Sequence, residues 1–126
     1  FGLLDMSWHG INPTKIADVK DHETAAFKAT QLFPNVPENC MSTAFAHIFQ
    51  GGYSSGYYSY KWAEVLDADA FEYFKENDLF DPEIAEAFKT HILSKGGTLD
   101  PLELYIKFRG QKPKVEPLLK RSGLLN

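Results

Sequence analysis

The chain has 126 residues, which suits one folded domain, and we expect a single domain over residues 1–126. Apolar residues make up 44% of it and charged residues 24%, a composition that excludes disorder. The net charge is -4 and the bases are scattered except near the C-terminus, so we expect no nucleic-acid partner. No apolar run approaches the ~20 residues that cross a bilayer, so we expect no membrane partner either.

The opening residues 1–9 resemble the last turns of a helix that begins elsewhere, so we expect the chain to be a fragment. Asp18 stands at an N-cap position ahead of a predicted surface helix over residues 19–32. Residues 34–39 carry two prolines and two asparagines, a composition typical of a loop. Cys40 is the only cysteine, so no intrachain disulfide forms and the cytoplasm is the expected location, with the periplasm left open.

The middle of the chain contains a glycine-rich loop and a long predicted helix. Residues 43–49 lead into the loop at 51–56, whose glycines allow positive φ and close approach of a ligand. From residue 57 to about 76, apolar side chains recur at helical spacing along one broad stripe. This helix is the centre of the predicted fold.

Later helices are marked by Asp-Pro pairs at 81–82 and 100–101, in which Asp caps and Pro takes the first helical position. Gly96 and Gly110 stand where left-handed C-caps are expected. A short final helix is predicted around 115–120. No alternation of the β type appears at any length, so the predicted fold class is all-α, a multi-helix arrangement with short connections.

The chain has four histidines, which makes a metal site one candidate. Residues 22–26 begin like the H-E-x-x-H zinc motif, but Ala26 stands where the second histidine must be. His9, His47 and His91 are far apart in the sequence. We therefore expect no metal ligand in this chain.

The stretch 47–62 is the best candidate for a functional site. Four tyrosines fall within eight positions, more phenols than a core can satisfy. Tyr57 and Tyr60 share a helix face, and Tyr53 lies on the loop before them. A neutral phenol can donate a hydrogen bond to a carbonyl oxygen that becomes an oxyanion, and His47 can donate too. The other interpretation is packing, because aromatic stripes are usually core and Gly-Gly is usually a turn.

At this stretch the sequence resembles the C-terminal region of the thimet oligopeptidase and dipeptidyl carboxypeptidase family of zinc metallopeptidases. The resemblance covers essentially the whole chain. Long runs match at 3–9, 47–62, 63–71, 92–97 and 108–110. Such long runs are specific, whereas a lone Gly-Gly-Tyr would carry little weight.

The resemblance implies a larger all-helical zincin peptidase that closes on short peptides, of the peptidyl-dipeptidase or oligopeptidase type, of which this chain is a C-terminal subdomain. The zinc ligands of the family precede this region, so zinc belongs to the parent enzyme and none is bound here. The partners implied are a short peptide and the upstream catalytic portion of the same polypeptide, without which this chain is expected to be inactive. The resemblance implies catalytic roles for Tyr60, as oxyanion donor, and His47, and substrate binding by Tyr53, Tyr57, Gly51 and Gly52.

Two other functions remain open. The chain could be a freestanding helical protein-interaction module without catalysis, its aromatic helix forming a binding face. It could also be a small hydrolase that pairs His47 with Ser54, Ser55 or Ser59, although no G-x-S-x-G motif supports this.

Four polar residues have structural interpretations. Asp67 and Asp69 are two apart on a helix and so point to different faces, which argues against an acid–base pair. His91 falls on an apolar stripe, where we expect a hydrogen-bonded core or boundary histidine. Arg109 ends a helix, where its charge suits the helix dipole.

Overall fold

A computed structural model describes residues 1–125, and within them the chain forms seven α-helices, short 3₁₀ and π turns, and no strand. The all-α prediction is confirmed. The chain divides into two compact units, Phe1–Tyr60 and Lys61–Asn126. That the whole chain is one C-terminal helical fragment of a larger catalytic domain stays a prediction. No helix within residues 1–125 combines the length and the apolar character needed to cross a membrane.

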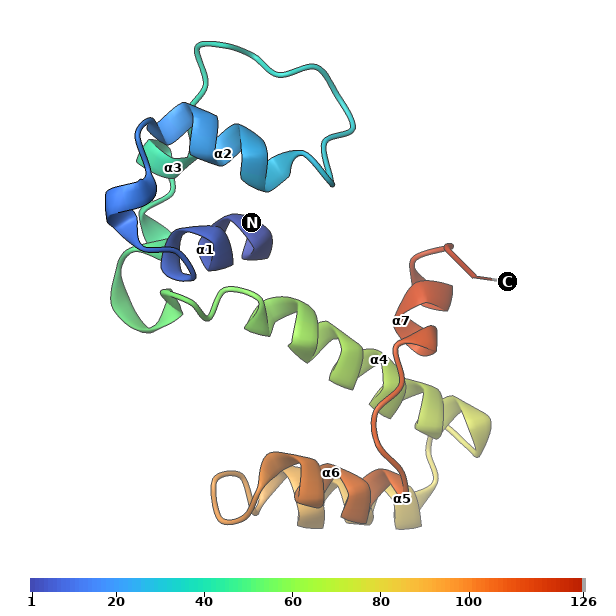
Figure 1. The fold of residues 1–126 in the computed structure, drawn as a ribbon. Helices are drawn as coiled ribbons and strands as arrows, with labels where there is room; N and C mark the ends of the chain where they lie inside the picture. The colour runs from blue at the N-terminus through green and yellow to red at the C-terminus, as the bar shows by residue number, and fades with distance from the viewer. Residues whose placement is uncertain (126) are drawn as a thin grey trace. The chain divides into compact units, whose positions relative to one another are not determined.

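The first unit consists of short helices joined by irregular segments (Figure 1). Helices α1 and α2 pack side by side, and α3 packs on α2. Leu4 and Ile48 are fully buried and form its apolar centre. The elements are α1 Gly2–His9, η1 Pro13–Lys15, α2 Val19–Phe27, α3 Met41–Ala44, η2 Ala46–Ile48 and η3 Gly51–Tyr53.

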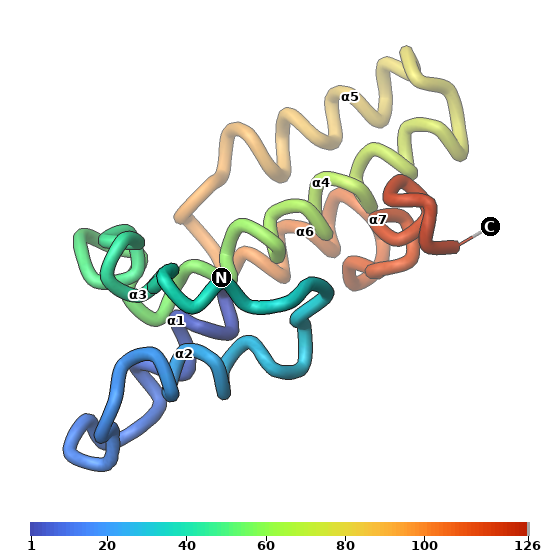
Figure 2. Tube along the Cα trace, turned by 90° about the horizontal axis from the view of Figure 1, so that it is seen from above, coloured from blue at the N-terminus to red at the C-terminus, as the bar shows by residue number. Residues whose placement is uncertain are grey.

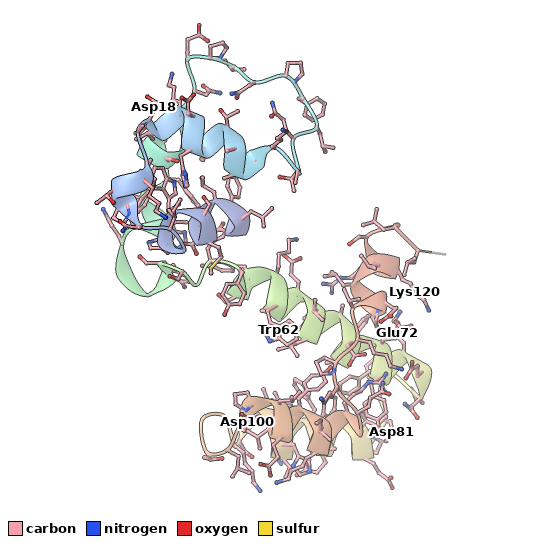
Figure 3. The ribbon with its side chains drawn as sticks, in the orientation of Figure 1. Asp18, Trp62, Glu72, Asp81, Asp100 and Lys120 are labelled. Carbon is pink, nitrogen blue, oxygen red and sulfur yellow. The ribbon has the colours of Figure 1, made fainter. Side chains whose placement is uncertain are left out.

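Helix α2 begins as predicted but ends early. The Asp18 carboxylate accepts a hydrogen bond from the Asp21 N–H at 2.9 Å, and Figure 3 shows Asp18 at the start of the helix. The predicted end at Leu32 is wrong, because the helix stops at Phe27. Both the N–H and the hydroxyl of Thr30 donate to the Phe27 carbonyl, at 2.8 and 3.2 Å, which closes a tight turn in place of another helical turn.

Two sets of hydrogen bonds join α3 to the other helices of this unit. Glu23 accepts hydrogen bonds from the N–H groups of Met41 and Ser42, at 2.8 and 2.6 Å, and so caps the start of α3 from a neighbouring helix. The Trp8 indole N–H on α1 donates to the Ser42 hydroxyl at 3.0 Å. Burial raises the pKa of Glu23, but hydrogen bonds from Ser42 and Met41 outweigh it and the net pKa lies below the usual value.

The second unit is built on the long helix α4, which begins at Ser59, two residues later than predicted, and ends at Glu76. The chain reverses direction after α4 and again before α6 (Figure 2). The remaining elements are α5 Pro82–Phe88, the π turn η4 Lys89–Leu93, α6 Pro101–Arg109 and α7 Glu116–Arg121.

The predicted caps of α5 and α6 are present. Asp81 accepts from the Glu83 and Ile84 N–H groups, and Asp100 accepts from those of Leu102 and Glu103. Both aspartates lie at the starts of their helices in Figure 3.

The prediction of a left-handed glycine is confirmed at Gly110, with φ +79°, but wrong at Gly96. Gly97 takes the left-handed conformation instead, with φ +77°. In the preceding π turn the Ser94 N–H reaches five residues back to the Lys89 carbonyl, at 2.9 Å. A π turn contains one residue more than an α-helical turn, so the left-handed residue is displaced by one position, from Gly96 to Gly97.

Aromatic rings fill the centre of the second unit. Phe108 on α6 is buried, and its ring centroid lies 5.1 Å from that of Phe88, 5.5 Å from Tyr73 and 6.1 Å from Phe74. Such edge-to-face and tilted pairs stabilise the fold beyond the hydrophobic effect of burying the rings.

A buried polar network lies beside these rings. Asp69 accepts a hydrogen bond from the Tyr105 hydroxyl at 2.7 Å, and the Arg109 Nε lies 3.5 Å from the same carboxylate oxygen. Arg109 also bonds Glu76 at 3.0 Å and stacks 4.6 Å from the Tyr73 ring centre, so it does more than complement a helix dipole. Burial, followed by the hydrogen bond to Asp69, raises the pKa of Tyr105.

Two further predictions concern side chains at the edge of this unit. Asp67 pairs with Arg121 at 2.6 Å on a face different from that of Asp69, as predicted. His91 is half-buried in the wall of a largely apolar cavity of about 590 Å³ between α4, α5 and α6. The predicted boundary position is therefore confirmed. Its Nδ1 is buried without a hydrogen-bond partner among residues 1–125, so the predicted hydrogen bond is wrong for that atom.

Candidate functional site

Four rings singled out by the sequence meet at the end of the first unit. His47 belongs to η2, Tyr53 to η3, and Tyr57 and Tyr60 to the segment where α4 begins. The His47 ring centroid lies 4.4 Å from that of Tyr53, 5.4 Å from Tyr57 and 6.1 Å from Tyr60. These four residues form the aromatic cluster.

The phenols of the aromatic cluster reach solvent. The Tyr53 and Tyr60 rings stack with centroids 5.5 Å apart and planes 11° apart. These two side chains are 38% and 44% exposed, so they are not interior packing. Tyr57 is half-buried and lies 5.1 Å from the Tyr60 ring.

Hydrogen bonding to Tyr53 raises the pKa of the Tyr60 hydroxyl, because that bond favours the protonated phenol. Desolvation and the neighbouring phenols Tyr53 and Tyr57 act in the same direction. Tyr60 is therefore a neutral hydrogen-bond donor throughout the neutral pH range.

Two phenylalanines support the cluster. The Phe45 ring lies 5.2 Å from Tyr57 and 5.9 Å from His47, in edge-to-face geometry. Phe1 packs in turn on Phe45 at 5.1 Å and on Tyr57 at 6.2 Å. Apolar contact therefore fixes the imidazole and the Tyr57 ring, while Tyr53 and Tyr60 stay open to solvent.

The loop before the cluster exposes bare backbone. Gly51 has φ +69°, a conformation that side-chain-bearing residues rarely adopt. A Cβ atom on Gly51 or Gly52 would meet no atom within 4 Å, so the space over both is open.

The carboxylate of Asp5 on α1 holds this loop, a contact that the sequence analysis missed. Its two oxygens accept hydrogen bonds from the N–H groups of Ser55 and Tyr57, each at 2.9 Å. Ser55 has φ +58°, the only positive φ of a non-glycine residue among residues 1–125. The available signal was an acid directly after the apolar pair Leu3-Leu4, in a segment that was predicted to be helical.

The residues present do not fit a zinc site. His22 Nε2 lies 3.1 Å from the Ser7 hydroxyl, the Glu23 carboxylate caps α3, and Ala26 has no ligand atom. No group of three His, Cys, Asp or Glu side chains within the described chain is arranged to hold a metal ion.

A serine hydrolase site finds no support in the geometry either. Among residues 1–125 no hydrogen bond joins His47 to the hydroxyl of Ser54, Ser55 or Ser59. Ser55 instead bonds Asp5 through its backbone N–H.

The aromatic cluster thus places two exposed phenols and a half-buried imidazole beside open loop backbone on an all-helical chain. The family model for Peptidase family M3 matches residues 1–124. The chain therefore belongs to Peptidase family M3, and its resemblance to the thimet oligopeptidase and dipeptidyl carboxypeptidase family is confirmed.

Individual relatives agree with this assignment. The chain is 48% identical to the Haemophilus influenzae oligopeptidase A, a match that covers 100% of this chain and 19% of the relative. It is 45% identical to the Arabidopsis thaliana organellar oligopeptidase A, over 99% of this chain and 16% of that protein. It is 40% identical to the Escherichia coli dipeptidyl carboxypeptidase, over 97% of this chain and 18% of the relative. The chain thus spans less than a fifth of the length of these relatives.

Proposed function

We propose that this chain is the C-terminal part of a zinc metallopeptidase that hydrolyses short peptides, of the oligopeptidase or peptidyl-dipeptidase type. Membership of Peptidase family M3 supports this proposal, as do the names of the relatives. The chain contributes groups that bind the substrate, and the zinc ligands lie in the preceding part of the polypeptide. Alone, the chain is inactive. We propose a cytoplasmic location, with the periplasm as the alternative.

The exposed, neutral phenol of Tyr60 is the observation that carries the proposal. Its hydroxyl donates to the scissile carbonyl oxygen, and the bond strengthens as negative charge develops there. His47 donates beside it. Tyr53 and Tyr57 contact the peptide, and the bare backbone at 51–52 lets the peptide approach.

Substitution of Tyr60 by Phe in the full-length enzyme tests the proposal, because it removes one hydroxyl and keeps the ring. Loss of one preorganised donor costs ~10²–10³ in kcat. KM should change far less, since the bond strengthens mainly in the transition state. Steady-state kinetics on a short peptide measures both constants.

Tyr58→Phe is the matched control. Tyr58 is 56% exposed, stands two residues before Tyr60 and lies outside the aromatic cluster. Its variant should keep the wild-type kcat. A Tyr60→Phe enzyme with unchanged kcat removes Tyr60 from the mechanism.

The alternative function is a helical interaction module without catalysis. The apolar cavity of about 590 Å³ in the second unit favours it, since such a surface can take an apolar side chain of a partner. A full-length protein that contains zinc and cleaves no peptide would favour this alternative over the peptidase.

A further inference from the structure

We infer that Asp5 is a positioning residue of the peptidase site: from α1 its carboxylate fixes the backbone of the loop that carries the phenols. This inference rests on the proposed function. Asp5 lies 42 residues before His47 in the sequence, and its hydrogen bonds to the loop are to backbone N–H groups, so it acts through the loop backbone.

Two backbone N–H groups donate to the Asp5 carboxylate, which is 0% exposed, and the His9 imidazole lies beside it. Oδ1 accepts from the Ser55 N–H and Oδ2 from the Tyr57 N–H, each at 2.9 Å. His9 Nδ1 lies 2.9 Å from Oδ1 and 2.8 Å from the Asp5 carbonyl oxygen. Since both neighbours of Nδ1 are acceptors, this nitrogen carries the ring hydrogen; its hydrogen bond is to the Asp5 carbonyl oxygen, and Oδ1 is a second close polar contact.

Backbone hydrogen bonds connect the held amides to the phenols. The Gly56 N–H donates to the Tyr53 carbonyl at 2.8 Å, and the Tyr60 N–H donates to the Tyr57 carbonyl at 3.3 Å. Of the two amides bound to Asp5, that of Ser55 lies within the first of these turns and that of Tyr57 begins the second. A shift of the loop against α1 therefore moves Tyr53 relative to Tyr60 and separates their stacked rings.

The conformation of Ser55 points the same way. Its φ of +58° lies in the left-handed region that disfavours a side chain, so the surrounding contacts must impose it. The hydrogen bond from Ser55 N–H to Asp5 is the contact that does so. The loop's shape is thus set from α1 and not by local preference.

The test compares Asp5→Asn with wild type in the full-length enzyme. The amide presents an NH₂ group to one of the two backbone N–H groups, which releases part of the loop without changing side-chain size. Misplacement by about 1 Å can cost ~10² in rate, so we expect kcat to fall by roughly that factor with little change in KM. Peptides containing Ser55 and Tyr57 should also exchange amide hydrogens faster.

Asp69→Asn is the matched control. Asp69 is an equally buried aspartate, but it accepts a hydrogen bond from Tyr105, forms an ion pair with Arg109 in the second unit, and is no part of the site. Its variant should unfold at a lower temperature and keep the wild-type kcat. A general response to loss of a buried carboxylate would lower kcat in both variants and would overturn the inference.

A double variant separates positioning from bulk stability. If Asp5 acts through the phenols, Asp5→Asn should lower kcat far less in a Tyr60→Phe background than in wild type. If the loss of kcat in the double variant equals the product of the losses in the two single variants, Asp5 does not act through Tyr60.

His9→Ala is the second variant, for the case in which Asp5→Asn does not fold. It removes one donor and leaves the two backbone bonds, so kcat should fall several-fold. An unchanged kcat in the folded variants overturns the inference, while slow cleavage by Tyr60→Phe still upholds the proposed function. A wild-type enzyme that cleaves no peptide refutes the proposed function itself.

Discussion

Each unit of the chain buries one aspartate completely, Asp5 in the first and Asp69 in the second, and the two are used differently. Asp69 is paired with the Tyr105 hydroxyl and the Arg109 guanidinium, which joins two helices around a core. Asp5 accepts from backbone amides at Ser55 and Tyr57, between the exposed rings of Tyr53 and Tyr60. One buried carboxylate thus joins two helices, whereas the other, on the function we propose, positions the groups that meet the peptide.

The aromatic rings repeat this contrast. Phe108 is surrounded by other rings in the second unit, while Tyr53 and Tyr60 stack against each other at the surface. Substitutions in the second unit should therefore change stability, and substitutions in the aromatic cluster should change rate.

Phe108→Ala should have the largest effect on stability. Removal of a buried ring costs about 3–5 kcal/mol, through lost burial and the cavity that remains. Hydrogen exchange of α4–α6 in the full-length protein measures this loss in the free energy of unfolding. We expect kcat to stay unchanged at temperatures below the unfolding transition. A loss under about 1 kcal/mol would mean that the second unit is not held by this ring cluster.

Glu23→Gln should cost less, about 1 kcal/mol, the usual value of a helix cap. The pKa of Glu23 is lowered in the folded state, so its contribution is present above the ordinary value of 4.5 and lost as the pH falls below it. Urea unfolding between pH 7 and pH 3 should show this acid dependence in the wild type and a reduced one in the variant. Equal slopes would rule out Glu23 as the group responsible.

Arg121→Ala should have the smallest effect. The ion pair of Arg121 with Asp67 is short, at 2.6 Å, but both side chains are well exposed, and such pairs contribute 0–1 kcal/mol. We expect a change below about 0.5 kcal/mol in urea unfolding, reduced further by salt. A larger loss would show that this pair orders α7.

Local signals in the sequence predicted most of the helices. Asp18, Asp81 and Asp100 cap helices as expected, because a cap depends on residues two or three positions away. The early end of α2 and the choice of Gly97 over Gly96 were missed. The first depends on the turn that Thr30 closes and the second on the π turn. In each, the hydrogen bonds differ little in energy from those of a continued α-helix.

The site was predictable in part. Tyr57 and Tyr60 lie together as their spacing predicted, but Tyr57 precedes α4, and a turn closed by the Tyr60 N–H on the Tyr57 carbonyl brings them together in place of a shared helix face. The approach of His47 and Tyr53 depends on how the loop folds, which spacing does not specify. Asp5 was missed since its partner amides lie 50 and 52 residues further on.

Protection of the phenols by a bound peptide tests the central claim most directly. The full-length enzyme would be treated with a phenol-acylating reagent, with and without a peptide that binds but resists cleavage, and modified tyrosines mapped by mass spectrometry. We expect the peptide to protect Tyr53 and Tyr60 and to leave Tyr58, which is more exposed than either, as reactive as before. Equal modification of all three with and without peptide would contradict the account.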